Sequence, residues 1–119
     1  MRISMCHCLA CQRRTGSAFG MQARWPKDRV EITGRHTEYV RISDAGNERR
    51  FRFCPDCGTT VFWTNEDSPD LIAVAIGTFA DSSFPQPTVS VHESRRYPWF
   101  SLPDGIERED DEHRHPPTR

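Results

Sequence analysis

Three cysteines within six residues are the most distinctive chemical feature of this sequence. Cys6, Cys8 and Cys11 form a C-x-C-x-x-C pattern close to the first residue. Zinc prefers tetrahedral sulfur and nitrogen ligands; its structural sites usually have four protein ligands, whereas its catalytic sites keep one position open. Three thiolates on one ion would leave such a position. The triplet therefore predicts a catalytic metal site.

A second cysteine motif lies in the middle of the chain. Residues 54–58 read C-P-x-C-G, which places Cys54 and Cys57 in a zinc-knuckle pattern between two predicted strands. The proline stiffens the turn, and the glycine permits the positive φ that lets backbone N–H groups point at the sulfurs. Cysteines are often only small buried apolar residues, but two such motifs in one short chain favour metal binding.

The sequence allows two divisions of its five cysteines. In one, the last two cysteines of the triplet join the later pair in a single four-cysteine site. This division leaves Cys6 without a role and needs a longer intervening stretch than the roughly 15–20 residues usual for this spacing. In the other division, the triplet and the pair bind different ions. A disulfide framework is not expected, because the number of cysteines is odd.

Composition limits what the chain can be. Its 119 residues suffice for one domain with one core, and its 16 basic and 17 acidic side chains give a net charge of -1. That balance provides no steering toward nucleic acid or an anionic membrane. No apolar run could span a bilayer, and the N-terminus lacks the apolar stretch of a signal peptide. We therefore expect a cytoplasmic protein without membrane or nucleic-acid partners.

Short alternating segments separated by Gly, Pro and Asn predict an all-β, antiparallel domain over residues 1–106. The expected strands are Phe19–Trp25, Arg29–Thr33, Thr37–Ile42, Arg49–Phe53, Thr59–Trp63 and Leu71–Phe79. Before them, residues 1–18 are expected to hold the triplet and a basic loop, and no segment predicts a long amphipathic helix. Residues 107–119 are charged and contain no apolar residue other than proline, which predicts a disordered tail.

Two longer stretches carry a resemblance to a known family. The stretch MCHCLACQRRTGSAFG, followed by FRFCPDCGTTVFW, resembles the glutathione-dependent formaldehyde-activating enzyme family. The segment HESRRYPWFSLPDGI is similar to that family's His-to-Trp stretch, so the match covers about residues 3–106. The resemblance implies a β-tent fold of antiparallel strands and a catalytic zinc on the triplet. It also implies that Cys54 and Cys57 join an earlier C-x-C motif to hold a structural zinc.

The sequence departs from the family at that earlier motif. In the family, the first C-x-C lies on an N-terminal strand upstream of the triplet. Here five residues precede Cys6, and none of them is cysteine. We therefore expect the family's N-terminal strand to be missing. The structural zinc site would then be incomplete, and empty or weakly occupied.

The reaction that the resemblance implies is the addition of glutathione to formaldehyde, which gives S-hydroxymethylglutathione. The chain would then be a carbon–sulfur lyase or synthase, with a thiol such as glutathione and an aldehyde as its small-molecule partners. The thiolate is the nucleophile, and coordination to zinc deprotonates a thiol. Cys6, Cys8 and Cys11 would be catalytic residues in this sense, because they hold the zinc.

Side chains close to the triplet are candidates for binding the substrate. Arg13 and Arg14 follow it directly, and arginine binds carboxylates, of which glutathione has two, through paired hydrogen bonds. Ser17 could donate a hydrogen bond to the substrate or to a metal-bound sulfur. A solvated basic loop and an ordinary turn are the alternatives for these residues. His7 is expected to point away from the metal, because adjacent residues diverge on an extended backbone.

A non-enzymatic zinc-ribbon-like binding module is the competing function. Zinc ribbons often bind a protein or a nucleic acid, and the segment RRFRF, residues 49–53, could form a basic and aromatic strand for single-stranded nucleic acid. Its aromatic residues alternate as in a half-buried strand, and the net charge is close to zero, which both argue against this function. The number of protein ligands on the zinc distinguishes the two functions. An open coordination position favours an enzyme, and four protein ligands favour a binding module.

Overall fold

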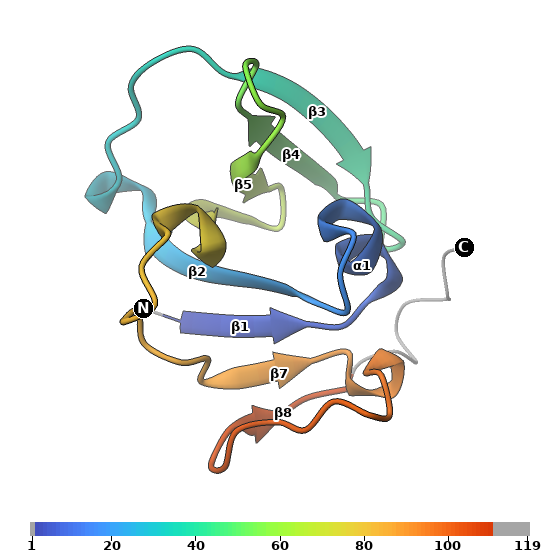
Figure 1. The fold of residues 1–119 in the computed structure, drawn as a ribbon. Coiled ribbons are helices and arrows are strands. Elements are labelled where there is room, and N and C mark those ends of the chain that lie inside the picture. The colour runs from blue at the N-terminus through green and yellow to red at the C-terminus, as the bar shows by residue number, and fades with distance from the viewer. Residues whose placement is uncertain (1, 111–119) are drawn as a thin grey trace.

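One eight-stranded sheet forms most of the structure (Figure 1). The structure, a computed structural model, describes residues 2–110. The strands are β1 Arg2–Cys6, β2 Gly20–Pro26, β3 Thr37–Ile42, β4 Glu48–Phe53, β5 Thr60–Asn65, β6 Ser68–Ala75, β7 Val89–Val91 and β8 Glu107–Arg108. Their order across the sheet is β3-β4-β5-β6-β2-β1-β7-β8. The pairs from β3 to β1 are antiparallel, and β7 runs parallel to β1 and to β8. The predicted all-β, mainly antiparallel fold is confirmed.

The α-helix of the described residues lies directly after β1. This helix, α1, spans Leu9–Thr15, where the sequence predicted a basic loop. Leu, Ala, Gln and Arg have high helix propensity. The Cys8 side chain caps the first turn, and Gly16 ends the helix with a φ of 63° and an N–H bond to the Gln12 carbonyl. The loop prediction was wrong because seven residues are too few to show a helical period.

Three short 3-10 segments complete the helical structure: η1 Lys27–Arg29, η2 Ile76–Phe79 and η3 Glu93–Arg95. The predicted strand Leu71–Phe79 is divided, because its first part belongs to β6 and its last part forms η2. No helix among residues 2–110 has the length and apolar character needed to cross a membrane.

The strand β1 was not predicted, although it lies inside the sheet. Residues 3–6 are all buried, so both faces of the strand are covered, and its polar and apolar residues alternate only over the four residues Arg2–Met5 before the triplet begins. Its antiparallel register with β2 places Cys6 opposite Gly20, and its parallel pairing with β7 places Cys6 beside Val91. The first cysteine of the triplet is thereby fixed at the end of a buried strand.

The segment Arg29–Thr33 does not form its predicted strand. It begins in η1 and is followed by Gly34, which has a φ of 90°. Residues 31–33 are exposed, and no strand of the described sheet pairs with them. Alternation alone does not make a strand when the backbone groups have no partner. The other five predicted strands are present: Thr37–Ile42 has the predicted bounds, and the boundaries of the other four are shifted by a few residues.

One face of the sheet carries an aromatic core beneath α1. Phe51 of β4 pairs with Trp63 of β5, and Trp63 pairs with Ala73 of β6, so these side chains form a row across three strands. The centroids of the Phe51 and Trp63 rings are 5.4 Å apart. The sheet curls around α1 (Figure 1), and Arg14 of this helix lies over the Trp63 ring. The row therefore supports the helix that carries Cys11.

The last described strand lies in a segment that the sequence assigned to the charged tail. Glu107 and Arg108 form β8 and pair with Val89 and Ser90 of β7. Backbone pairing therefore continues past residue 106, the predicted end of the domain. Residues 111–119 of the predicted tail lie outside the described residues.

Candidate metal and substrate site

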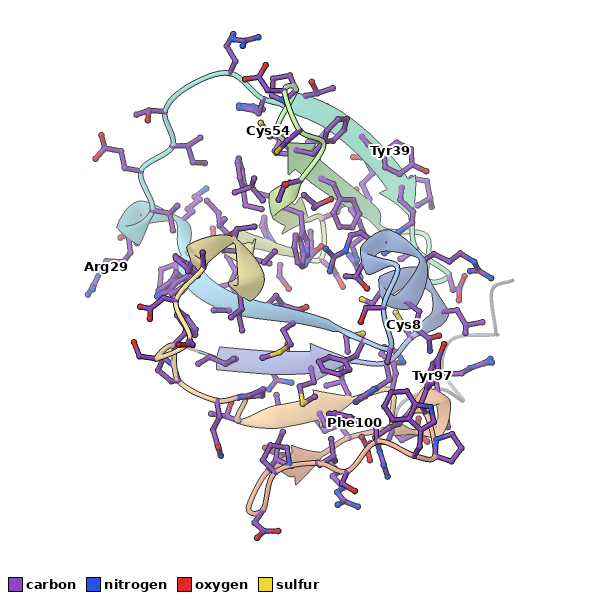
Figure 2. The ribbon with its side chains drawn as sticks, in the orientation of Figure 1. Cys8, Arg29, Tyr39, Cys54, Tyr97 and Phe100 are labelled. Atoms are coloured by element: carbon purple, nitrogen blue, oxygen red, sulfur yellow. The ribbon has the colours of Figure 1, made fainter. Side chains whose placement is uncertain are left out.

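The three cysteines of the triplet converge where β1 meets α1. Cys6 ends the strand, Cys8 caps the helix, and Cys11 lies in the first part of the helix. Their Sγ atoms all lie within 4.8 Å of one another. Figure 2 shows Cys8 beneath α1, next to the end of β1. Within residues 2–110, no other group of three or more His, Cys, Asp or Glu side chains is this close.

Hydrogen bonds within the triplet shift the pKa values of Cys6 and Cys8 in opposite directions. The Cys11 N–H donates to Cys8 Sγ over 3.4 Å. Bonds from the Cys11 and Cys6 thiols to the same sulfur hold the pKa of Cys8 well below its usual range. The bonds to Cys11 and Cys8, followed by burial, raise the pKa of Cys6. A metal that binds all three sulfurs has to displace protons, so its affinity rises with pH.

The donor set of the triplet suits a soft metal ion. A Zn–S bond of about 2.3 Å places tetrahedral sulfur ligands roughly 3.8 Å apart. That spacing lies inside the observed limit of 4.8 Å. Thiolate ligands select soft or borderline ions such as zinc over magnesium and calcium. The triplet could therefore hold a metal ion, and three sulfurs leave one position of a tetrahedral ion for a further ligand.

His7 lies between two cysteines of the triplet but points away from them. Its side chain is 1% exposed, and Nε2 lies 2.8 Å from Ser90 Oγ. The Ser90 hydroxyl donates to Glu93 Oε2 over 2.5 Å, so its oxygen accepts from His7 and the imidazole proton is on Nε2. Burial lowers the pKa of His7, which favours the neutral ring. These bonds tie the loop of the triplet to β7 and η3.

Ser90→Ala is expected to lower the free energy of unfolding by about 1–3 kcal/mol, because it leaves the buried Nε2–H of His7 without its acceptor. Urea unfolding followed by circular dichroism measures the change. Ser94→Ala is the matched control, since Ser94 is exposed in η3, and its effect should be below about 0.5 kcal/mol. Equal stability of the two variants would show that the bond between Ser90 and His7 does not support the fold.

The knuckle pair lies in the turn between β4 and β5. Figure 2 shows Cys54 well separated from Cys8. Gly58 has a φ of 78° and donates its N–H to the Cys54 carbonyl over 2.8 Å. Cys57 Sγ lies 3.1 Å from Thr59 Oγ1, and this bond lowers the pKa of Cys57. No third His, Cys, Asp or Glu of residues 2–110 forms a metal-binding group with the pair. The structure therefore places the knuckle pair apart from the triplet, which argues against a single four-cysteine site.

A small cavity of about 190 Å³ opens beside the triplet. Its lining includes four arginines: Arg14, Arg24, Arg41 and Arg49. Asp44 is the acidic side chain among the lining residues, and Arg49 is neutralised by a bidentate pair with Asp67. The cavity therefore places positive charge next to the sulfurs.

Arg14 is held at this cavity by aromatic rings. Its Cζ lies 4.5 Å from the centroid of Trp63 and 5.8 Å from that of Phe51, which are cation–π distances. Its Nη2 is buried, and the part of the chain that the structure describes offers it no hydrogen-bond partner. Gly20 leaves room for this atom, since a Cβ there would lie 2.8 Å from Nη2 and 3.4 Å from Cys11 Cβ. Arg14 thus presents an unsatisfied donor close to the sulfurs.

A larger cavity of about 750 Å³ adjoins the small one. Both are lined by Arg14 and Arg41, whereas Arg13 is exposed and lines only the larger one. Ser17, predicted as a substrate-binding residue, lies exposed after α1 and lines neither cavity. Its N–H donates to Thr15 Oγ1 over 3.2 Å. Of the three predicted substrate-binding residues, the structure brings Arg14 closest to the triplet.

Several residues that line the small cavity were not identified from the sequence. Gln22 and Arg24 come from β2, Arg41 from β3 and Asn65 from β5. The signal available in the sequence was the polar pair Gln22 and Arg24 at alternate positions of a predicted strand, which places both on one face. His92 lines the cavity too, with a left-handed φ of 57°, and the sequence did indicate this residue, since it begins the segment that is similar to the family's His-to-Trp stretch.

The fold and the site define a small all-β protein with a cysteine cluster that could hold a metal ion, beside a cationic cavity. Residues 1–95 match the model of the glutathione-dependent formaldehyde-activating enzyme family, and the chain belongs to this family. The resemblance carried by the two cysteine motifs is therefore confirmed. Membership connects the chain with an enzymatic activity that involves glutathione and formaldehyde in general. No curated protein sequence matches the chain.

Proposed function

We propose that the chain is a zinc-dependent carbon–sulfur lyase or synthase that joins glutathione to an aldehyde, in the manner of S-(hydroxymethyl)glutathione synthase. The supporting observation is the convergence of three sulfurs within 4.8 Å on a cavity that holds an unsatisfied arginine donor. In this proposal the triplet holds the catalytic zinc. Cys54 and Cys57 supply two of the four ligands that a structural zinc needs, so that site binds zinc weakly.

The reaction requires a thiolate and a carbonyl carbon at the same place. The sulfur attacks the aldehyde carbon, a C–S bond forms, and the thiol proton ends on the former carbonyl oxygen, so no oxidant or reductant is consumed. A zinc ion on the triplet would supply a position for the thiol and favour its thiolate form. The guanidinium of Arg14 contributes positive charge where the sulfur and the developing oxyanion are negative.

The two adjoining cavities differ in volume, and each suits one of the two substrates. The larger one, about 750 Å³, falls in the range of sites that hold drug-sized ligands and suits the tripeptide. The smaller one, about 190 Å³, suits the aldehyde. Because Arg14 lines both, its guanidinium can pair with a glutathione carboxylate while the thiol reaches the triplet.

The contacts of β4 argue against the alternative function, a module that binds single-stranded nucleic acid. The arginines of the RRFRF segment have acidic partners: Arg49 pairs with the turn between β5 and β6, and Arg50 and Arg52 pair with Glu38. Phe51 is buried under Arg14 and is not available for stacking on a base. A strand that binds single-stranded nucleic acid needs unpaired cations and exposed rings.

Arg14→Ala is expected to weaken glutathione binding about tenfold to a hundredfold, because a charge-assisted hydrogen bond contributes roughly 1.5–3 kcal/mol. Arg13→Ala is the matched control. Arg13 is exposed, and an exposed ion pair contributes about 0–1 kcal/mol, so its effect should be at most about fivefold. Isothermal titration of the zinc-loaded chain with glutathione measures both, and zinc content should not change in either variant. A larger loss in Arg13→Ala than in Arg14→Ala would contradict this placement of the substrate.

A further inference from the structure

The small cavity beside the triplet holds more positive charge than the sulfurs require. Four arginines line it, and Asp44 is the acidic side chain among the lining residues. Arg49 is neutralised by its pair with Asp67. Zinc with three thiolates would carry one net negative charge. Before a substrate binds, three guanidinium groups therefore face two negative charges, and the surplus positive charge favours an anionic ligand.

Arg24 places an unsatisfied buried donor in this cavity. It lies on β2, opposite Arg2 of β1 and Ala73 of β6, and its buried Nε has no hydrogen-bond partner among residues 2–110. Burial and then the charges of Arg2 and Arg49 lower the pKa of Arg24, so its surroundings disfavour the charged form. An anion bound here would supply both the missing acceptor and the missing charge.

Two unsatisfied acceptors line the same cavity. Gln22 Oε1 and Asn65 Oδ1 are buried, and no described residue forms a hydrogen bond with either atom. Gln22 is fixed, because its Nε2 donates to Ser4 Oγ over 2.7 Å. A cavity with an unpaired cationic donor and unpaired amide oxygens suits a ligand that has both a carboxylate and a hydroxyl group.

Addition of a thiol creates such a ligand when the aldehyde itself carries a carboxylate. The sulfur bonds to the carbonyl carbon, the carbon–oxygen double bond becomes a single bond, and the thiol proton converts the oxygen into a hydroxyl group. The product then has a hydroxyl group and a carboxylate close together. Formaldehyde offers no carboxylate, and its adduct would leave Arg24 Nε without an acceptor.

We propose that the small cavity binds the carboxylate of the aldehyde. The substrate class is then a small aldehyde with a carboxylate next to the carbonyl carbon, of which glyoxylate is the simplest member. This inference rests on the proposed addition of glutathione to an aldehyde. It assigns Arg24 to the carboxylate, and one of the two amide oxygens, Gln22 Oε1 or Asn65 Oδ1, to the single O–H of the adduct's hydroxyl group. A cavity of about 190 Å³ holds an acid of a few heavy atoms and excludes larger ones.

The test compares three aldehydes with glutathione and the zinc-loaded chain: glyoxylate, glycolaldehyde and formaldehyde. Glycolaldehyde is close to glyoxylate in size but has no carboxylate. Exchange NMR measures how fast each adduct forms and dissociates, corrected for the uncatalysed rate and for the hydrated fraction of each aldehyde. We expect kcat/KM for glyoxylate to exceed that for glycolaldehyde by about tenfold to a hundredfold.

Variants of Arg24 identify the group responsible. Arg24→Gln should remove most of the preference for glyoxylate and leave glycolaldehyde and formaldehyde within about twofold of wild type. Arg24→Lys keeps the charge without the Nε–H and should give an intermediate preference. Arg50→Gln is the matched control, because its neighbour Arg49 lines the cavity while Arg50 faces the other side of β4 and pairs with Glu38. It should behave as wild type.

Each other outcome overturns the inference in a distinguishable way. Turnover of formaldehyde with no preference for glyoxylate removes the carboxylate site and leaves the proposed function intact. If Arg24→Gln slows formaldehyde as much as glyoxylate, the cavity serves a carboxylate of glutathione. If no aldehyde reacts faster than without protein, the proposed function fails as well. Should both Arg24 variants misfold, the wild-type comparison of glyoxylate with glycolaldehyde decides alone, and equal rates overturn the inference.

Discussion

Cys8→Ser is expected to reduce zinc affinity at the triplet by about a hundredfold to several thousandfold. Zinc bound by thiolates has an apparent binding free energy of roughly 10–16 kcal/mol, so one of three sulfur ligands accounts for about 3–5 kcal/mol, at 1.4 kcal/mol per tenfold. A serine hydroxyl does not ionise near neutral pH and cannot replace the thiolate. Competition with a chromogenic chelator measures the affinity, and Cys6→Ser and Cys11→Ser should give losses of similar size.

Cys57→Ser is the matched control for these variants. Cys57 is exposed in the knuckle and does not belong to the triplet. Its replacement should leave the tightly held zinc in place, at one ion per chain. Full zinc occupancy in every triplet variant would show that the triplet is not the metal site. Loss of the tight zinc in Cys57→Ser alone would place that ion at the knuckle.

Trp63→Ala is expected to lower the free energy of unfolding by about 3–5 kcal/mol, the usual cost of truncating a buried tryptophan. Trp63 is 5% exposed, packs against Phe51 and Ala73, and supports the guanidinium of Arg14. Urea unfolding measured by circular dichroism gives the change. A variant that folds should also bind glutathione more weakly, because Arg14 loses the ring that positions it.

Trp99→Ala provides the comparison for the same chemical change at the surface. Trp99 is 70% exposed, so its removal should alter the free energy of unfolding by less than about 0.5 kcal/mol. If the two tryptophan variants are equally stable, the aromatic row is not the core that supports α1.

The strands of the sheet were largely predictable, but the two elements that build the site were not. The segment Thr37–Ile42 was predicted with the observed bounds because its residues alternate and a glycine precedes it. By contrast, β1 is buried on both faces and alternates over only four residues before the triplet begins, and α1 has seven residues and no periodic apolar stripe. Patterns as short as these do not identify a strand or a helix.

The residues of the site also fall into a group that could be predicted from the sequence and a group that could not. The cysteine triplet was predicted from spacing alone, because ligands close in sequence need only a tight turn to converge. Arg14 was identified as a neighbour of the triplet in sequence. Arg24 and Asn65 join the cavity only through the pairing of strands that lie far apart in the chain, which no local pattern reveals. Strand order and register determine that part of the site.

The central claim is that a substrate thiol binds at the metal held by Cys6, Cys8 and Cys11. Cobalt substitution tests it most directly, since absorption by cobalt–thiolate centres reports the number and type of ligands. The account predicts that one equivalent of cobalt binds tightly, and that glutathione changes the sulfur-to-cobalt charge-transfer band with saturation. S-methylglutathione, which has no thiol, should leave that band unchanged. An unaltered cobalt spectrum at millimolar glutathione would contradict the account.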